Sequence, residues 1–399
     1  MITLTGRQAR QFMLIKQGLL GEYKFIGKQG ALDYIRQAGC IQFDPVDVCG
    51  KNSEITLQSR VGGFTKEMLA ELLYTDRKLF DYPDKQLAII PTEYWAYFER
   101  FRKAARDNLK QHPEVKKHIE KIRKFIDKNG AVNSDDFKLE GDSSWRSAIN
   151  WSSGSKLSRS VLEQMYSSGD LIVHHKKGTR RYYDLAAKHI PPEILNVSDP
   201  LSDDFAHLKW RVMRRIGAVG FMWNRPSDAW LHIWGLSNDV RKEIFDALID
   251  KKEITEFTIE GLKTKFYFLT SDMPLVKEVL TNPNPRPRCE LIAPLDPFMW
   301  DRKLIRAIFG FEYSWEIYTP PQKRKYGAYV LPLIYGEQFI GRVEAVCDRK
   351  TKTLIVKNIW YEKGVKQTKI QEKAVSACIK KFMLFNGCKL VSISKERKL

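Results

Sequence analysis

The feature that most constrains this chain is a succession of two helical segments and a short hairpin, which occurs twice. The first copy begins with a helical pattern over residues 114–128, and a second helix starts near Ser155 and stops at Gly169. Two strand-forming stretches follow, at 171–175 and 180–183, on either side of a basic Lys-Lys-Gly-Thr turn. The spacing of apolar residues predicts the helices, and the turn residues predict the hairpin. This order of elements is the outline of a winged helix.

The second copy repeats the scheme with no obvious sequence identity to the first. Helices are expected over residues 203–216 and 239–249, and strands over 253–259 and 264–269. Three tryptophans in this copy fit core packing better than base stacking: Trp223, Trp230 and Trp234.

The two ends of the chain differ from these copies. Near the N-terminus we expect helices over residues 3–17, 28–38 and 66–74, with a short extended stretch at 40–45. Towards the C-terminus the sequence changes to β-rich runs and one final helix, at 313–318, 328–335, 338–346, 353–360 and 368–385. Short strands separated by turns are typical of an antiparallel meander or a small barrel.

The charge of the chain indicates a polyanionic partner. It has 67 Lys and Arg residues against 48 Asp and Glu residues, a formal net charge of +19. A field of that sign concentrates polyanions, so nucleic acid is the first candidate and an anionic membrane surface the second. No stretch resembles a signal peptide or a membrane span. Six scattered cysteines without a Cys-x-x-Cys pair indicate free thiols in a reducing cytosol.

Most catalytic motifs are absent from the sequence. It has no Walker-type loop, no Gly-x-Gly-x-x-Gly and no Gly-x-Ser-x-Gly. The histidines do not show a metal-ligand spacing either. His112 and His118 lie six residues apart, and the adjacent His174 and His175 would point to opposite faces of a strand. We therefore expect no metal site and no cofactor.

The stretch Gln42-Phe43-Asp44-Pro45 is the remaining candidate for chemistry. In an extended chain Gln42 and Asp44 share one face and Phe43 points into the core, and Pro45 disfavours a helical conformation at Asp44. The amide could orient one water molecule, while the carboxylate accepts its proton or stabilises positive charge. An aspartate before a proline is also a common turn former, so the motif alone leaves both interpretations open. Asp47 is more simply structural and is the reserve candidate for the active carboxylate.

Four stretches carry a resemblance to a known family. Residues 39–44 are similar to a Gln-aliphatic-Gln or Gln-aliphatic-Asp motif, and residues 57–62, 293–302 and 317–332 follow in the expected order. In these stretches the chain resembles the AlkZ/YcaQ-type winged-helix DNA glycosylases, which release N-alkylated purines and unhook interstrand crosslinks. The chain departs from the family pattern at Phe43, where an aliphatic residue is usual, and after the motif, where histidines are expected.

The resemblance implies an α+β protein of three tandem winged-helix domains, over residues 1–110, 111–192 and 193–285. An antiparallel β-barrel-like domain with a terminal helix, residues 286–399, closes the chain. The implied protein is a cytoplasmic monomer, nucleoid-associated when bound to double-stranded DNA with alkylated purines or crosslinks, with no membrane partner. The resemblance implies Gln42 and Asp44 as catalytic residues. Aspartate at the second position suggests the YcaQ-like branch, which is expected to be broader in substrate.

One carboxylate is enough for this reaction. Ordinary glycoside hydrolysis needs an acid for the leaving group and a second carboxylate. An N3- or N7-alkylated purine already carries positive charge and leaves as a neutral base, so it needs no acid. Asp44 could stabilise the oxocarbenium-like sugar and take a proton from water, while Gln42 positions that water.

Basic residues of the predicted hairpin and of the C-terminal segment are candidates for phosphate contacts. Two further candidates follow the catalytic motif: Asn52 lies between the first two similar stretches, and Arg60 lies within the second. The expected DNA-binding residues are Asn52, Arg60, Lys176, Lys177, Arg180, Arg181, Lys323, Arg324 and Lys325. A solvated turn remains the alternative for the hairpin. A regulator that binds DNA without chemistry, or a basic scaffold that binds RNA, remains the alternative for the whole chain.

Overall fold

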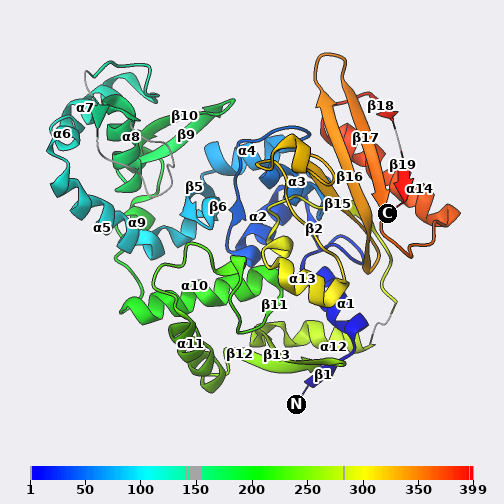
Figure 1. Ribbon diagram of the computed structural model, residues 1–399. Helices are drawn as coiled ribbons and strands as arrows, with labels where there is room; N and C mark the ends of the chain where they lie inside the picture. Colours follow the sequence, from blue (N-terminus) through cyan, green and yellow to red (C-terminus); the bar gives the residue numbers. More distant parts are fainter. Residues whose placement is uncertain (1, 140–141, 144–154, 282–283, 395, 399) are drawn as a thin grey trace. The chain divides into compact units, whose positions relative to one another are not determined.

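The chain forms two compact units in a computed structural model. The structure describes residues 2–139, 142–143, 155–281, 284–394 and 396–398 (Figure 1). Met1–Leu69 and Leu208–Leu399 together make one unit, called the split unit below, and Ala70–His207 make the middle unit. Among the described helices none is long and apolar enough to cross a membrane. The fold is mixed α+β.

The middle unit contains a hairpin, several helices and a second, longer hairpin. In chain order its elements are β5 (Leu79–Asp84), β6 (Gln86–Pro91), η1 (Thr92–Phe98), α5 (Glu99–Asn108), η2 (Leu109–Gln111), α6 (Pro113–Lys116), α7 (Ile119–Asn129), β7 (Asp142–Ser143), β8 (Ser155–Lys156), α8 (Leu157–Ser167), β9 (Leu171–Lys177), β10 (Arg180–Leu185), η3 (Ala186–Lys188) and α9 (Pro192–Leu195). Its edges fall within two helices, α4 (Lys66–Tyr74) and α10 (Asp204–Val219).

The second hairpin of the middle unit confirms the predicted succession of elements. β9 pairs antiparallel with β10, and an isolated bridge between Val132 and Tyr183 adds a third extended segment. Helix α7 buries Ile122 and Ile126, as its apolar spacing predicts. Helix, bridge, helix and hairpin is the order of a winged helix, and Figure 1 shows the hairpin extending beyond α8.

The N-terminal helices and the second copy belong to the split unit. Its elements before the C-terminal sheet are β1 (Ile2–Leu4), α1 (Gly6–Lys16), β2 (Phe25–Ile26), α2 (Gly27–Ala38), β3 (Ile41–Gln42), α3 (Asn52–Gln58), β4 (Val61–Gly62), β11 (Phe221–Met222), η4 (Asp228–Trp230), α11 (Asn238–Asp250), β12 (Ile254–Ile259), β13 (Leu262–Leu269), η5 (Thr270–Asp272) and α12 (Met273–Thr281). Thr5 and Gln8 form a capping box that starts α1. Gly39, with φ +72°, ends α2, in agreement with the helix predicted over residues 28–38.

A four-stranded sheet, in the order β1-β12-β13-β11, supports these helices. β1 pairs in parallel with β12, so residues from the very start of the chain lie beside residues 257–259. A group of buried aromatic rings fills the space between α1 and this sheet: Phe12, Phe221, Phe257, Phe266 and Phe268. Burying such large apolar side chains is the main stabilisation available to this part of the fold.

The C-terminal sheet covers the other part of the split unit. It contains β14 (Cys289–Leu291), β15 (Val330–Tyr335), β16 (Gln338–Asp348), β17 (Thr353–Tyr361), β18 (Leu390–Ile393) and β19 (Glu396–Lys398), with η6 (Pro297–Met299), α13 (Arg302–Phe309) and η7 (Pro321–Lys323) between β14 and β15. Helix α14 (Lys369–Phe385) buries Ile379 and Phe382 in the same core as Leu331, Val343 and Val356 of the sheet. The predicted terminal helix is thereby confirmed.

Several expectations from the sequence are corrected. The C-terminal sheet is mixed rather than antiparallel, because β18 and β19 pair in parallel with β17. Residues 313–318 form no strand. The helix expected over 114–128 is two helices, because the helical conformation is interrupted at Lys117 and His118. Trp234 is 66% exposed, although Trp223 and Trp230 are buried as expected.

The compact units also differ from the four expected domains, because residues 1–69 pack with residues 208–399. The number of winged-helix domains and their boundaries remain predictions.

Candidate active site

The catalytic motif lies on an irregular segment of the split unit. Strand β3 ends at Gln42, residues 43–51 form neither helix nor strand, and α3 begins at Asn52. We call residues 43–51 the strap. Gln42 is 6% exposed, and its side-chain Oε1 accepts no hydrogen bond within the described part of the chain. A buried amide oxygen without a partner is costly, so Gln42 is a candidate for binding a water molecule or a ligand.

Asp44 lies within the strap and is half-buried. Its Oδ1 accepts a hydrogen bond of 2.9 Å from the backbone N–H of Val46, which is the geometry of an Asx turn. No hydrogen bond to its Oδ2 occurs among residues that the structure describes. Burial raises the pKa of Asp44, and the Val46 N–H only partly offsets this effect. A carboxylate with a raised pKa is a better proton acceptor than an ordinary aspartate.

The turn-former interpretation of Asp44 is therefore correct for one oxygen and leaves the other available. Phe43 is half-buried, which corrects the expectation that its side chain points into the core. Because β3 ends at Gln42, the alternation of a regular strand does not extend to Asp44. The described contacts include no hydrogen bond between the side chains of Gln42 and Asp44.

Asp47, the reserve carboxylate, has structural contacts. Its Oδ1 accepts a hydrogen bond of 3.1 Å from the Gly50 N–H and lies 2.6 Å from the Arg349 guanidinium. The Val48 carbonyl also accepts a hydrogen bond from the Cys347 N–H at 2.9 Å. These contacts attach the strap to β16 and the turn that follows it, and they favour Asp44 as the reactive group.

Asn52 joins the motif to a distant segment. Its Nδ2 donates to the Gln42 carbonyl at 3.0 Å, and its Oδ1 accepts from the Leu295 N–H at 2.9 Å. Asn52 is 2% exposed. The expectation that Asn52 contacts DNA is therefore corrected: its amide is buried and hydrogen-bonded at both ends, so it positions the backbone of Gln42.

Arg60 receives a similar correction. It is fully buried, and its guanidinium forms a bidentate pair with Asp296 in which both distances are 2.9 Å. It also donates to the carbonyls of Gln17 and Thr56. Because its donors have partners inside the protein, Arg60 is not available to a DNA phosphate. The pair instead joins two of the stretches on which the family resemblance rests.

The fourth stretch reaches the strap through Tyr329. Its hydroxyl donates to the Gly50 carbonyl at 3.5 Å. Burial raises the pKa of Tyr329 well above its ordinary value, and the negative charges of Asp44 and Asp47 raise it further. Trp315 packs edge-on against Tyr329, and the exposed Tyr318 packs against Trp315. A neutral phenol and a row of aromatic rings therefore lie near the strap.

The hairpin of the middle unit presents only some of its predicted cations. Lys177 and Arg180 are exposed. Lys176 is 8% exposed at its side chain and forms an ion pair with Asp81, so it is corrected to a structural cation. Arg181 packs near the rings of Tyr166 and Tyr183 and is half-buried. Lys177 and Arg180 remain predicted phosphate contacts.

The loop before β15 shows the same division. Lys323 and Lys325 are exposed, whereas the half-buried Arg324 donates to the Thr319 carbonyl at 2.8 Å. Glu316 closes this loop, because its carboxylate accepts hydrogen bonds from the N–H groups of residues 325, 326 and 327. Burial opposes the charge of Glu316, but these three hydrogen bonds and Arg324 hold its pKa below the ordinary value. Lys323 and Lys325 remain predicted DNA contacts.

One group of side chains has no counterpart in the sequence predictions. His174, Asp184 and His189 gather at the base of the β9–β10 hairpin, with one potential metal-ligating atom of each within 4.8 Å of the others. The expectation that no such constellation exists assumed a regular strand. His174 and His175 instead lie with their Nδ1 atoms 2.8 Å apart.

Comparison with known proteins identifies the family to which the whole chain belongs. The structure is similar to the DNA glycosylase AlkZ of Streptomyces sahachiroi, with a TM-score of 0.63 and 15% sequence identity over 99% of this chain and 100% of that chain. At this identity the likeness establishes the fold alone. The family model for AlkZ-like DNA glycosylases matches residues 35–385, which include the strap and all four of the similar stretches. Because this match spans most of the chain, the protein belongs to the AlkZ-like DNA glycosylase family.

Proposed function

We propose that this protein hydrolyses the N-glycosidic bond of N-alkylated purines, such as 7-methylguanine, in double-stranded DNA. The observation that carries the proposal is the presence of spare hydrogen-bonding capacity on two polar side chains that lie two residues apart in the motif. Gln42 has a buried amide oxygen without a hydrogen bond among the described residues, and Asp44 has one carboxylate oxygen outside its turn. The proposal places one water molecule between these two groups, where it would donate a hydrogen bond to each.

The reaction balances with these two groups alone. Asp44 takes a proton from the water held by Gln42, and the water oxygen forms a bond to C1′ of the deoxyribose. The electron pair of the C1′–N bond moves to the alkylated purine and cancels its positive charge. The base leaves neutral and an abasic site remains. No lysine amine attacks the sugar, so the enzyme is monofunctional.

The raised pKa of Asp44 supports its role as the base. Burial disfavours the charged carboxylate, and this makes the carboxylate a stronger proton acceptor. The negative charge of the Asp44 carboxylate also attracts the cationic base and stabilises the positive charge that develops on the sugar. Asp44 is only half-buried, which fits a site open enough for a bulky lesion. We propose on this basis that the enzyme also unhooks interstrand crosslinks at alkylated purines.

DNA is held by charge outside the site. Lys177, Arg180, Lys323 and Lys325 are exposed cations, and the chain as a whole carries +19. Contacts of this kind bind any sequence and weaken with salt. We propose that the protein acts as a monomer that needs no cofactor.

The test uses a duplex with one 7-methyl-2′-deoxyguanosine. Released base is measured by chromatography with mass spectrometry, and the abasic site by cleavage in alkali. A positioned general base contributes roughly 10²–10⁴-fold to the rate, so Asp44→Asn should lower the single-turnover rate by at least about 100-fold while DNA affinity stays unchanged. Gln42→Ala should also lower this rate.

Asp47→Asn is the matched control. The amide can still accept the Gly50 hydrogen bond, and only the partly exposed pair with Arg349 is lost. Such a pair contributes about 0–1 kcal/mol, so the Asp47 variant should remain folded and active. If the wild type binds the duplex but releases no base, the chain is a non-enzymatic DNA-binding protein instead. Equal activity of the Asp44→Asn variant and the wild type would remove Asp44 from the mechanism.

A further inference from the structure

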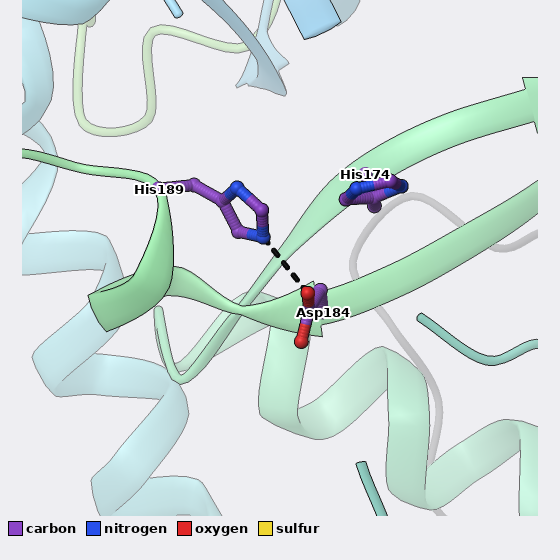
Figure 2. A group of neighbouring side chains, drawn as sticks. All are labelled: His174, Asp184 and His189. Atoms are coloured by element: carbon purple, nitrogen blue, oxygen red, sulfur yellow. Dashed lines mark hydrogen bonds and ion pairs between the residues drawn. The ribbon is translucent and has the colours of Figure 1, made fainter. Parts of the chain in front are cut away.

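The base of the long hairpin in the middle unit gathers two imidazoles and one carboxylate. His174 comes from β9, Asp184 from β10, and His189 from the residue that follows η3 (Figure 2). The three side chains offer ligating atoms within 4.8 Å of one another. Figure 2 shows the His189 ring directed at the Asp184 carboxylate, and the two atoms of that contact lie 2.8 Å apart.

A β-bulge creates this arrangement. Tyr182 pairs with His175, but Tyr183 pairs with Val173, so His174 is the extra residue of β9. A bulge redirects side chains and breaks the strict alternation of a strand. The freed carbonyls of Val173 and His174 accept hydrogen bonds from the Arg77 guanidinium, at 3.1 and 3.3 Å. The backbone that carries His174 is therefore fixed by a specific side chain.

The three side chains supply the kinds of ligand atom that bind a transition-metal ion. Asp184 is 6% exposed, and its Oδ1 accepts the Leu185 N–H at 2.8 Å, which orients Oδ2 towards His189. The neutral imidazole binds metals through a ring nitrogen, and each of the two histidines offers one such atom to the cluster. Two imidazoles and one carboxylate are a recurrent set of protein ligands for Zn²⁺.

We propose that His174, Asp184 and His189 bind one divalent transition-metal ion, with Zn²⁺ as the reference ion, and that water completes the coordination. The required changes in distance are at most about 1.5 Å, because no two of the ligand atoms lie more than 4.8 Å apart. Ligand bonds of about 2.0–2.1 Å in a tetrahedral site place two ligand atoms about 3.3 Å apart. The His189 Nε2 and Asp184 Oδ2 atoms, now 2.8 Å apart, would therefore separate by about half an ångström.

Nearby cations limit the affinity without closing the site. Lys188 lies 4.0 Å from Asp184 Oδ1 but is closer to Asp127, at 3.0 Å. Arg77 faces the hairpin carbonyls rather than the carboxylate. The bound ion would connect β9, β10 and the turn after η3, and so fix the root of the hairpin that carries Lys177 and Arg180. This inference rests on the cluster itself and not on the proposed glycosylase activity.

The test starts from full-length protein freed of metal with a chelator. Titration with ZnCl₂ is followed by calorimetry, and titration with Co²⁺ by the visible absorption of a tetrahedral nitrogen and oxygen site. We expect one ion per chain. Loss of an outer partner of a metal ligand costs roughly 10–100-fold in affinity, so His189→Ala or His174→Ala, which remove a ligand itself, should cost at least about 100-fold. His118→Ala, in the same unit but outside the cluster, should bind as the wild type does.

Each variant is compared by circular dichroism before titration. A measurement on the wild type alone guards against variants that misfold: the imidazole ¹⁵N resonances of His174 and His189 should shift together on addition of one equivalent of Zn²⁺, while that of His118 stays in place. The proposal fails if the wild type takes up no Zn²⁺, if several ions bind weakly, or if His189→Ala and His118→Ala bind alike.

Discussion

The hairpin of the middle unit offers a test of DNA binding that is independent of catalysis. Lys176 and Lys177 are neighbours in β9 but have different surroundings. Lys177 is exposed, whereas Lys176 is paired with Asp81 and is 8% exposed. If the exposed cation contacts a phosphate, Lys177→Ala should reduce the salt dependence of binding. Removing the paired cation together with its partner, in Lys176→Met/Asp81→Asn, should leave it unchanged.

The size of the effect follows from counterion release. Each phosphate contact adds about 0.9 to the negative slope of log K against log salt concentration. Loss of one contact should therefore flatten the slope by about 0.9. Between 50 and 200 mM salt, a fourfold change, the wild-type affinity should fall about 3.5-fold more than that of the variant. Adding Arg180→Ala should double the change in slope to about 1.8.

The assay is fluorescence anisotropy with an undamaged duplex at four or more salt concentrations. An undamaged duplex keeps base release out of the measurement. The reasoning is refuted if Lys177→Ala retains the wild-type slope. It is also refuted if the Lys176→Met/Asp81→Asn variant, shown to be folded by circular dichroism, flattens the slope as much as Lys177→Ala does.

Three further predictions concern the split unit. Arg60→Met leaves the buried carboxylate of Asp296 without its cation, at a cost of about 3–5 kcal/mol. This corresponds to about 6–20 °C in the thermal midpoint by calorimetry, whereas Arg286→Met, at an exposed pair, should change the midpoint little. Base release should fall as the pH falls through the pKa of Asp44, which burial raises above the ordinary value of about 3.9, because only the charged carboxylate can accept a proton. The folded state favours the neutral form of Asp44. The Asp44→Asn variant should therefore unfold at pH 7 no more easily than the wild type. Asn52→Ala leaves two buried backbone groups without hydrogen-bond partners, the Gln42 carbonyl and the Leu295 N–H. It should lower the free energy of unfolding in urea by roughly 2–6 kcal/mol, and an unchanged midpoint would contradict the bridging role of Asn52.

Much of the fold follows from local patterns in the sequence. Apolar spacing predicts α4 at the observed residues, and α11 and α14 to within a residue or so at each end. A glycine ends α2 where expected, and the turn residues place the β9–β10 hairpin. In each case the determining interactions lie within a few residues of one another, so a window of the sequence contains them.

The sequence could not predict features that depend on pairing between distant residues. The parallel position of β18 and β19 depends on how the chain returns after α14. The bulge at His174 depends on the register of two strands, and its effect is to bring together residues that alternation places on opposite faces. The sequence therefore led to the expectation of no metal ligands at the place where the structure gathers three.

The candidate site shows the same limit in its electrostatics. A sequence identifies Arg60 as a cation but cannot reveal that Asp296, 236 residues away, neutralises it. Each buried pair of this kind removes one positive and one negative charge from the surface, as Lys176 and Asp81 also do. The net charge of +19 is therefore unaffected by such pairs, and the inference of a polyanionic partner does not depend on which cations are buried. The assignment of individual contacts does depend on it, because the stretches that resemble the family contain buried cations with internal partners, such as Arg60, as well as exposed cations, such as Lys323 and Lys325.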